Sequence, residues 1–138
     1  SNWNSIVIGD EPREKLNFNH KNLKILGFQN HNTVTKWFTR SKIAVVCSRN
    51  FEPFGRTALE ASSCGCAVII SNRGGLPEAS PHAIKINKLT VDNLKNKITK
   101  LINNQNLLIK SQKLIYSNFK LTNKKTSKDI DKYRSKLI

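Results

Sequence analysis

Short apolar segments alternate with amphipathic segments along residues 5–87, and this alternation constrains the fold more than any other feature of the sequence. The segment 43–47, Ile-Ala-Val-Val-Cys, contains no polar residue, which is typical of a strand in a sheet that is covered on both faces. Shorter strands are predicted at residues 6–8, 23–26, 67–70 and 83–86, and helices at 32–40 and 55–64. Strands that alternate with helices at this spacing predict a parallel α/β sheet with right-handed crossovers.

The rest of the chain has a helical pattern. Thr90 is a suitable N-cap and Asp92 falls in the first turn of the helix that follows. Apolar stripes continue to the last residues. No Pro- or Gly-rich linker divides the chain, so residues 1–138 are predicted to form a single partial domain, with a sheet part over about 5–87 and a helical tail over about 90–138.

Positive charge is concentrated in the helical tail. The chain carries a formal net charge of +15, and residues 85–138 hold thirteen Lys and one Arg against three Asp, a net charge of +11. The tail has only three aromatic residues, Tyr116, Phe119 and Tyr133, and no Arg-rich cluster of the kind that base stacking requires, so nucleic acid is not expected as a partner. Solvated helix faces account for the lysines, and association with an anionic membrane surface stays open as an alternative.

The three cysteines and the N-terminus indicate a reducing compartment. Cys47, Cys64 and Cys66 are an odd number and lack the paired spacings of a zinc site, so they are interpreted as buried, reduced thiols. No run of about 18 apolar residues is present, and the first residues do not resemble a signal peptide. A cytoplasmic location is expected, with peripheral association at the inner membrane face left open.

Potential chemistry is concentrated directly after the strand at 43–47. Glu52 and Glu60 flank a Pro-Phe-Gly turn that leads into a helix. Ligands of open α/β sheets bind outside the carboxyl ends of the strands, which is where this turn lies. The amides of Phe54, Gly55 and Arg56 fall at the helix N-terminus, where unpaired N–H groups and the helix dipole favour a phosphate.

The two carboxylates suit a nucleotide-sugar. Glu60 lies roughly 7 Å along the helix, at about 1.5 Å of rise per residue, and an ionised carboxylate accepts hydrogen bonds from a vicinal diol. Glu60 would accept hydrogen bonds from ribose hydroxyls, and Glu52 would meet the sugar. From the residues alone, a capped helix with one surface glutamate stays open as an alternative.

The chain resembles the family 4 (group 1) retaining glycosyltransferases of the GT-B fold, in their C-terminal, donor-binding half. The resemblance is carried by the runs Ser48-x3-Glu52-Pro53-Phe54-Gly55-x4-Glu60-Ala61, Gly65-x-Ala67-Val68-Ile69 and Gly74-Gly75-Leu76-Pro77-Glu78. The Glu-x7-Glu spacing is that family's signature. Flanking similarity includes Val7-Ile8-Gly9-Asp10-x-Pro12-Arg13-Glu14 and Leu26-Gly27-Phe28.

The resemblance implies transfer of a hexosyl group from a UDP- or GDP-sugar to a carbohydrate or lipid-linked acceptor, with retention, in polysaccharide or glycolipid assembly. Glu52 would contact the donor sugar at the reacting centre and Glu60 would hold the ribose. Gly27 and Phe28 would lie near the base. Gly74 and Gly75 would face the phosphates, or would form only a tight turn. No metal and no cofactor are expected.

The chain departs from the family pattern at its start. The given residues are expected to lack the family's first, central strand, the Arg and Lys that grip the diphosphate, and the acceptor domain. A second copy or another segment would then complete the sheet, and the chain alone is expected to be inactive. A non-catalytic nucleotide-sugar-binding module is therefore the alternative function, ahead of a basic protein that binds membranes or nucleic acid.

Overall fold

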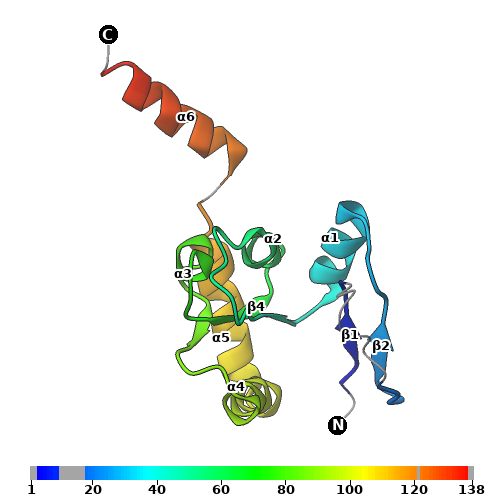
Figure 1. Cartoon of the computed structure of the whole chain (residues 1–138). Coiled ribbons are helices and arrows are strands. Elements are labelled where there is room, and N and C mark those ends of the chain that lie inside the picture. The colour runs from blue at the N-terminus through cyan, green and yellow to red at the C-terminus, as the bar shows by residue number, and fades with distance from the viewer. Residues whose placement is uncertain (1–2, 10–17, 121, 137–138) are drawn as a thin grey trace. The chain divides into compact units, whose positions relative to one another are not determined.

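The computed structural model describes residues 3–9, 18–120 and 122–136, and the chain forms two compact units, Ser1–Trp37 and Phe38–Ile138. The element order alternates between strands and helices up to the fifth strand and is helical thereafter. The expected α/β class with parallel strands and flanking helices is confirmed (Figure 1). The prediction of one partial domain over residues 1–138 stays a prediction.

The first unit contains a two-stranded parallel sheet. Its strands are β1 (Ser5–Val7) and β2 (Leu23–Ile25), in a register that places Ile6 opposite Lys24. The pairing continues past both strands, because Gly9 N–H donates to the Gly27 carbonyl at 2.9 Å. Helix α1 (His31–Arg40) follows, and the boundary between the units falls within it. None of its side chains is fully buried.

The second unit contains a three-stranded parallel sheet in the order β3-β4-β5. These strands are β3 (Ile43–Val46), β4 (Ala67–Ser71) and β5 (Ile84–Ile86). Every residue of β4 is buried, as a strand with a neighbour on each side requires.

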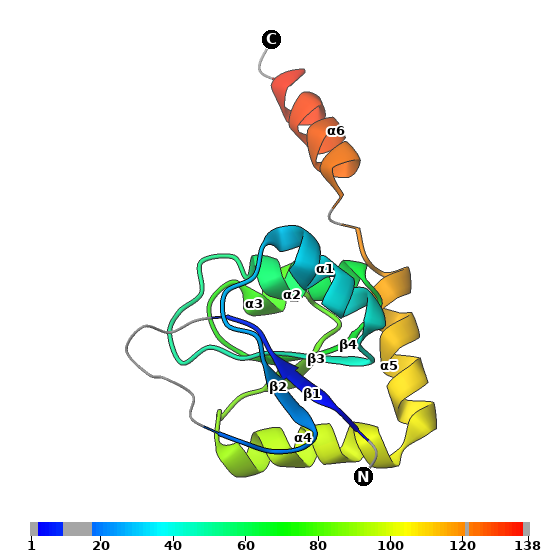
Figure 2. The ribbon, with the colours of Figure 1, turned by 90° about the vertical axis from the view of Figure 1, so that its right-hand side faces the viewer.

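Five helices belong to the second unit: α2 (Arg56–Ser63), α3 (Leu76–Ala79), α4 (Val91–Asn103), α5 (Gln105–Ser117) and α6 (Asn123–Arg134). Both α2 and α5 pack on β4, while α4 packs on β5 and meets α5 at an angle (Figure 2). The described side chains of α6 are all exposed. Helix α3 was not predicted, because four residues that begin with Leu-Pro are too short to show a helical period.

The core lies between the sheet and helices α2 and α5. Val68 and Ile70 of β4 pack with Ala58 and Ala61 of α2 and with Ile115 of α5. The small alanines allow α2 to approach the sheet closely. This packing places the first turn of α2 beside the carboxyl ends of β3 and β4, where the candidate site lies.

The helix boundaries follow the sequence signals. Thr90 caps α4, since its hydroxyl accepts a hydrogen bond from Asn93 N–H at 3.2 Å. Gly65 follows α2 with φ of 80°, the left-handed conformation that ends many helices. In the part of the chain that the structure describes, no helix is long and apolar enough to cross a bilayer.

We expect Ile70→Ala to destabilise the protein by about 2–5 kcal/mol, because truncation of a fully buried side chain leaves a cavity. Urea unfolding followed by circular dichroism measures the loss. Val91→Ala, at a side chain that is 82% exposed, is the control and should change stability by less than about 0.5 kcal/mol. Equal losses would contradict the assignment of β4 to the core.

Candidate functional site

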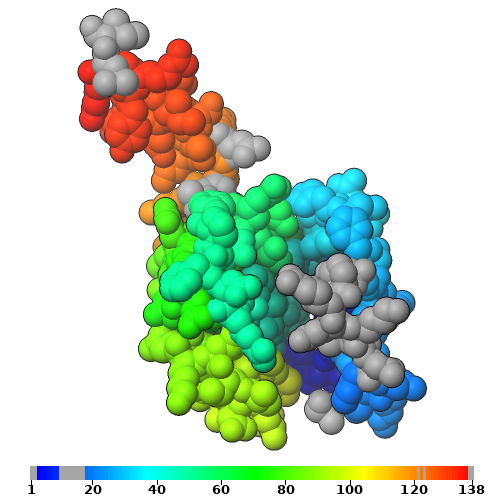
Figure 3. Space-filling model, viewed as in Figure 1, coloured from blue at the N-terminus to red at the C-terminus, as the bar shows by residue number. Residues whose placement is uncertain are grey.

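The candidate site is formed by the two loops that follow β3 and β4. Because the strands are parallel, both loops leave the sheet at the same edge. Residues 47–55 connect β3 to α2, and residues 72–75 connect β4 to α3. The blue-green segment after β3 lies exposed on the face turned to the viewer in Figure 3.

A pair of serines joins the two loops where the strands end. The hydroxyl of Ser71 accepts from Ser48 N–H at 3.0 Å and donates to the Ser48 carbonyl at 3.0 Å. Ser71 is buried, so this exchange satisfies polar groups that water does not reach. It takes the place of the ladder hydrogen bonds and extends the pairing of β3 and β4 beyond Val46 and Ile70.

The loops then touch backbone to backbone. Gly75 N–H donates to the Glu52 carbonyl at 2.7 Å. A Cβ atom at Gly74 would lie 2.7 Å from the Glu52 amide nitrogen, and a Cβ atom at Gly75 would lie 2.7 Å from Phe54 Cα. Side chains are therefore excluded from both glycine positions. The structure thus brings together four predicted site residues, Glu52, Phe54, Gly74 and Gly75. Close packing of the loops explains the two glycines whether or not they also face phosphates.

Gly55 is the turn from the loop into α2. Its φ of 84° is in the left-handed region that favours glycine. The Gly55 carbonyl accepts hydrogen bonds from the N–H groups of Ala58 and Leu59, at 3.0 and 3.2 Å. The N–H groups of Arg56 and Thr57 thus precede the helical ladder, and the first turn of α2 contains no acidic residue. This arrangement suits an anion at the predicted place.

Glu60 lies one turn further along α2. Its carboxylate is 3.7 Å from the guanidinium of Arg56, and the two side chains are 23% and 81% exposed. Glu52 is half-buried. The prediction assigned Arg56 only a backbone amide, but the structure also places its side chain beside the carboxylate predicted to hold the ribose.

Gly27 and Phe28, predicted to lie near the base, belong to the first unit. Gly27 follows β2 with φ of 62°, and the Phe28 side chain is 81% exposed. The predicted motif that begins at Val7 is described only in part, because Asp10 to Glu14 lie outside the described residues.

Arg73 is a residue of this site that sequence reasoning missed. Its guanidinium Nη1 donates to the Arg49 carbonyl, and its Cζ lies 5.5 Å from the centre of the Phe51 ring. The signal was an arginine directly before Gly74-Gly75. The sequence alone gave no reason to assign this arginine a role, because its contacts with the loop that carries Glu52 depend on the fold.

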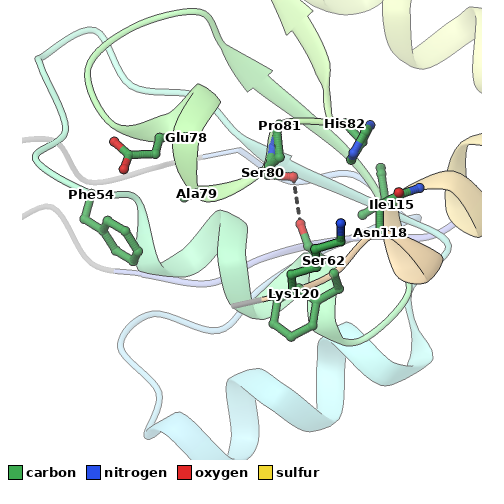
Figure 4. A pocket seen from close by; sticks show the side chains of 11 residues that line it. Phe54, Ser62, Glu78, Ala79, Ser80, Pro81, His82, Ile115, Asn118 and Lys120 are labelled. Atoms are coloured by element: carbon green, nitrogen blue, oxygen red, sulfur yellow. Dashed lines mark hydrogen bonds between the residues drawn. The ribbon is translucent and has the colours of Figure 1, made fainter. Parts of the chain in front are cut away.

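A cavity of about 340 Å³ is lined in part by Phe54, which belongs to the loop after β3. It lies between α2, α3 and the end of α5, with Phe54 and Glu78 at one end and Asn118 at the other (Figure 4). Ser62 donates to the Ala58 carbonyl, and its hydroxyl lies 2.8 Å from that of Ser80. Since these buried hydroxyls bond within the protein, we assign the cavity no ligand.

The cysteines are all free thiols. Burial was expected of all three, but only Cys66 is buried, while Cys47 and Cys64 are partly exposed. Burial, followed by the nearby Cys64, raises the pKa of the Cys66 thiol to about 12. Among the described residues, no three His, Cys, Asp or Glu side chains gather as a metal site requires.

The fold and the site together define a Rossmann-like α/β domain with a glycine turn into α2 and two glutamates, Glu52 and Glu60, in the segment that follows the carboxyl end of β3. Residues 1–121 match the family described as glycosyl transferases group 1. The chain belongs to this family.

An uncharacterised glycosyltransferase of Methanocaldococcus jannaschii is 39% identical over 70 residues, which are 51% of this chain and 17% of that protein. The structure also matches Anabaena HepE, a GT-B glycosyltransferase, in complexes with UDP and with UDP and glucose. The TM-scores are 0.72 and 0.68, each at 20% identity, with 97% and 96% of this chain covered. The chain spans about two fifths of HepE, 41% and 40% in these complexes. The GT-B fold expectation is confirmed.

We expect Gly74→Ala to destabilise the protein by about 1–3 kcal/mol more than Gly65→Ala. Both glycines have positive φ, 58° and 80°, so the backbone strain of the substitution is similar. They differ in space, because the nearest atom to a Cβ at Gly65 is a Tyr116 ring carbon at 3.8 Å. Urea unfolding compares the two variants, and equal destabilisation would show that the loops do not make the close contact.

We expect the Cys66 thiol to resist alkylation by iodoacetamide at pH 8 in the folded protein, while Cys64 reacts. A pKa raised to about 12 keeps Cys66 protonated at pH values well below 12, and only the thiolate is nucleophilic. Peptide mass spectrometry with and without 8 M urea, roughly a fully denaturing concentration, measures both sites. Equal labelling of Cys64 and Cys66 without urea would contradict the burial.

Proposed function

We propose that this chain is the donor-binding part of a retaining hexosyltransferase that uses a UDP- or GDP-sugar. The observation that carries the proposal is the contact between the Glu52 loop and Gly74-Gly75, which fixes the Glu52 backbone in the loop that leads into α2, a helix with no acidic residue in its first turn. Membership of the group 1 family supports a nucleotide-sugar as donor. The fold match to HepE, which binds UDP and UDP-glucose, supports the same donor chemistry.

The diphosphate would lie against the N–H groups at the start of α2. N–H groups that precede the helical ladder point along the helix axis, and the dipole adds positive potential there. The amides of Phe54, Gly55 and Arg56 are the proposed donors. Fixed dipoles of this kind stabilise the charge that develops on a leaving group. The proposal includes no metal and no cofactor.

Glu60 would accept hydrogen bonds from the ribose hydroxyls. A carboxylate offers only acceptor oxygens to a diol, and the Arg56 guanidinium lies 3.7 Å from this one. Gly27 and Phe28 would meet the base. We propose that Gly74 and Gly75 face the phosphates in addition to their packing role, since their loop leaves the sheet at the same edge as the loop that leads into α2.

Glu52 would support the reaction at the anomeric carbon. The bond from that carbon to the diphosphate oxygen breaks, the acceptor hydroxyl oxygen forms the new bond on the same face, and its proton passes to the departing diphosphate. An ionised Glu52 would stabilise the positive charge that builds on the sugar ring meanwhile. The acceptor is proposed to be a carbohydrate or a lipid-linked sugar, in polysaccharide or glycolipid assembly.

The remaining parts of the proposal concern partners and location. The 138 residues alone are proposed to bind the donor without transferring the sugar. A second copy of the chain or another segment is proposed to complete the sheet. The lysine-rich tail is proposed to favour an anionic membrane surface, in a cytoplasmic protein. A module that binds nucleotide-sugars without catalysis is the second candidate, and it shares the donor site.

We expect calorimetric titration to show that the chain binds either UDP or GDP, and that Glu60→Ala weakens the binding by about 1–3 kcal/mol, since ribose hydroxyls lose their acceptor. Asp129→Ala on the exposed helix α6 removes the same charge and should leave the affinity unchanged.

The same titration at low and high salt separates specific from polyanion-like binding. A steep loss of affinity with salt, equal in all variants, would show attraction to the lysines instead of a site. Absence of binding for every nucleoside diphosphate and nucleotide-sugar would overturn the proposed function.

A further inference from the structure

The loops after β3 and β4 are joined by contacts at both ends of the segment from Arg49 to Phe51. Ser71 exchanges hydrogen bonds with Ser48, and Gly75 N–H donates to the Glu52 carbonyl at 2.7 Å. Both of these contacts use backbone groups of the first loop. Between them, the segment from Arg49 to Phe51 is exposed, so burial does not hold it in place.

Arg73 is the side chain that spans this exposed segment. One guanidinium nitrogen donates to the Arg49 carbonyl, and the guanidinium carbon lies 5.5 Å from the centre of the Phe51 ring. The Phe51 side chain is 80% exposed. A charged donor forms a stronger hydrogen bond than a neutral one, and a cation over the ring face adds an electrostatic attraction. One side chain thus fixes both a carbonyl and a ring in the residues that precede Glu52.

The chemistry requires arginine. A planar guanidinium can donate to a carbonyl in its own plane while its face or edge lies against a ring, whereas the point charge of lysine cannot hold both contacts in one geometry. Arg73 also precedes Gly74, so its backbone is held by the close contact with Glu52. The guanidinium therefore extends from a backbone position that is itself fixed.

We propose that Arg73 is a positioning residue that orders the segment from Arg49 to Phe51, and through it directs the Glu52 carboxylate toward the donor sugar. The part that concerns the sugar rests on the proposed function; the ordering of the loop does not. Arg73 acts through the loop backbone and the Phe51 ring, and it does not itself contact the reacting atoms.

The experiment compares Arg73→Ala and Arg73→Lys with Arg49→Ala. The last variant removes an exposed arginine from the same loop but keeps the backbone carbonyl that accepts from Arg73. Nitrogen-15 relaxation gives the order parameters of the Phe51 and Glu52 amides. Calorimetry gives the dissociation constants of the nucleoside diphosphate and of its nucleotide-sugar.

In Arg73→Ala, the order parameter of the Phe51 amide is expected to fall below about 0.6, the range of flexible backbone. The nucleotide-sugar should bind about ten-fold more weakly, a change of about 1.4 kcal/mol, while the nucleoside diphosphate, which does not reach Glu52, changes by less than about two-fold. Arg73→Lys should restore neither the order parameter of the Phe51 amide nor the affinity for the nucleotide-sugar to the wild-type value. Arg49→Ala should match the wild type in both.

Unchanged order parameters in Arg73→Ala would overturn the proposal. Arg49→Ala would also overturn it if this variant lost order and nucleotide-sugar affinity to the same extent, since that would indicate a general effect of charge. Full rescue by Arg73→Lys would overturn the argument from guanidinium geometry. If the wild type binds no nucleotide, the proposed function fails, and the order parameters still decide whether Arg73 orders the loop.

Discussion

The hydrogen bond from Gly75 N–H to the Glu52 carbonyl, 2.7 Å long, brings two loop backbones into direct contact at the carboxyl edge of the sheet. This approach depends on glycine at positions 74 and 75, because a Cβ atom at either would lie within 2.7 Å of the opposite backbone. It sets the path of the chain into α2 and hence the position of the first N–H groups of that helix. A side chain at Gly74 would displace the Glu52 backbone and change the path of the loop into α2.

The core between the sheet and helices α2 and α5 supports the elements from which these loops extend. Val68 and Ile70 of the central strand are fully buried against α2 and α5, and small alanines on α2 let the helix lie close to the sheet. Rigid packing at this level holds the loops without burying them, so Glu52 stays half-buried and Phe51 exposed. Under the proposed function, a nucleotide-sugar would reach polar groups whose backbones are already held in place, which lowers the ordering cost of binding.

The apolar segments predicted the positions of the strands well, because short apolar runs between turns are typical of strands. Cover on both faces was expected of the segment 43–47, but within β3 only Ala44 is buried and Val45 is 44% exposed, whereas β4 is buried at every residue. The segment at 43–47 became β3 with a difference of one residue, and Thr90 and Gly65 marked helix ends that the structure confirms. The short helix α3 was missed, since four residues carry no period. Complete burial of the cysteines was wrong for Cys47 and Cys64, because burial depends on the neighbouring elements and not on residue type.

The sequence by itself determined the class of the fold, the family and the spacing of Glu52 and Glu60 around a glycine turn. These properties are local, since periodicity, caps and motif spacing involve residues close along the chain. Only the tertiary structure decided that Gly74-Gly75 packs on Glu52 and that Arg73 reaches Arg49 and Phe51. Those contacts join residues more than twenty positions apart, and the parallel pairing of β3 with β4 is what brings their loops together.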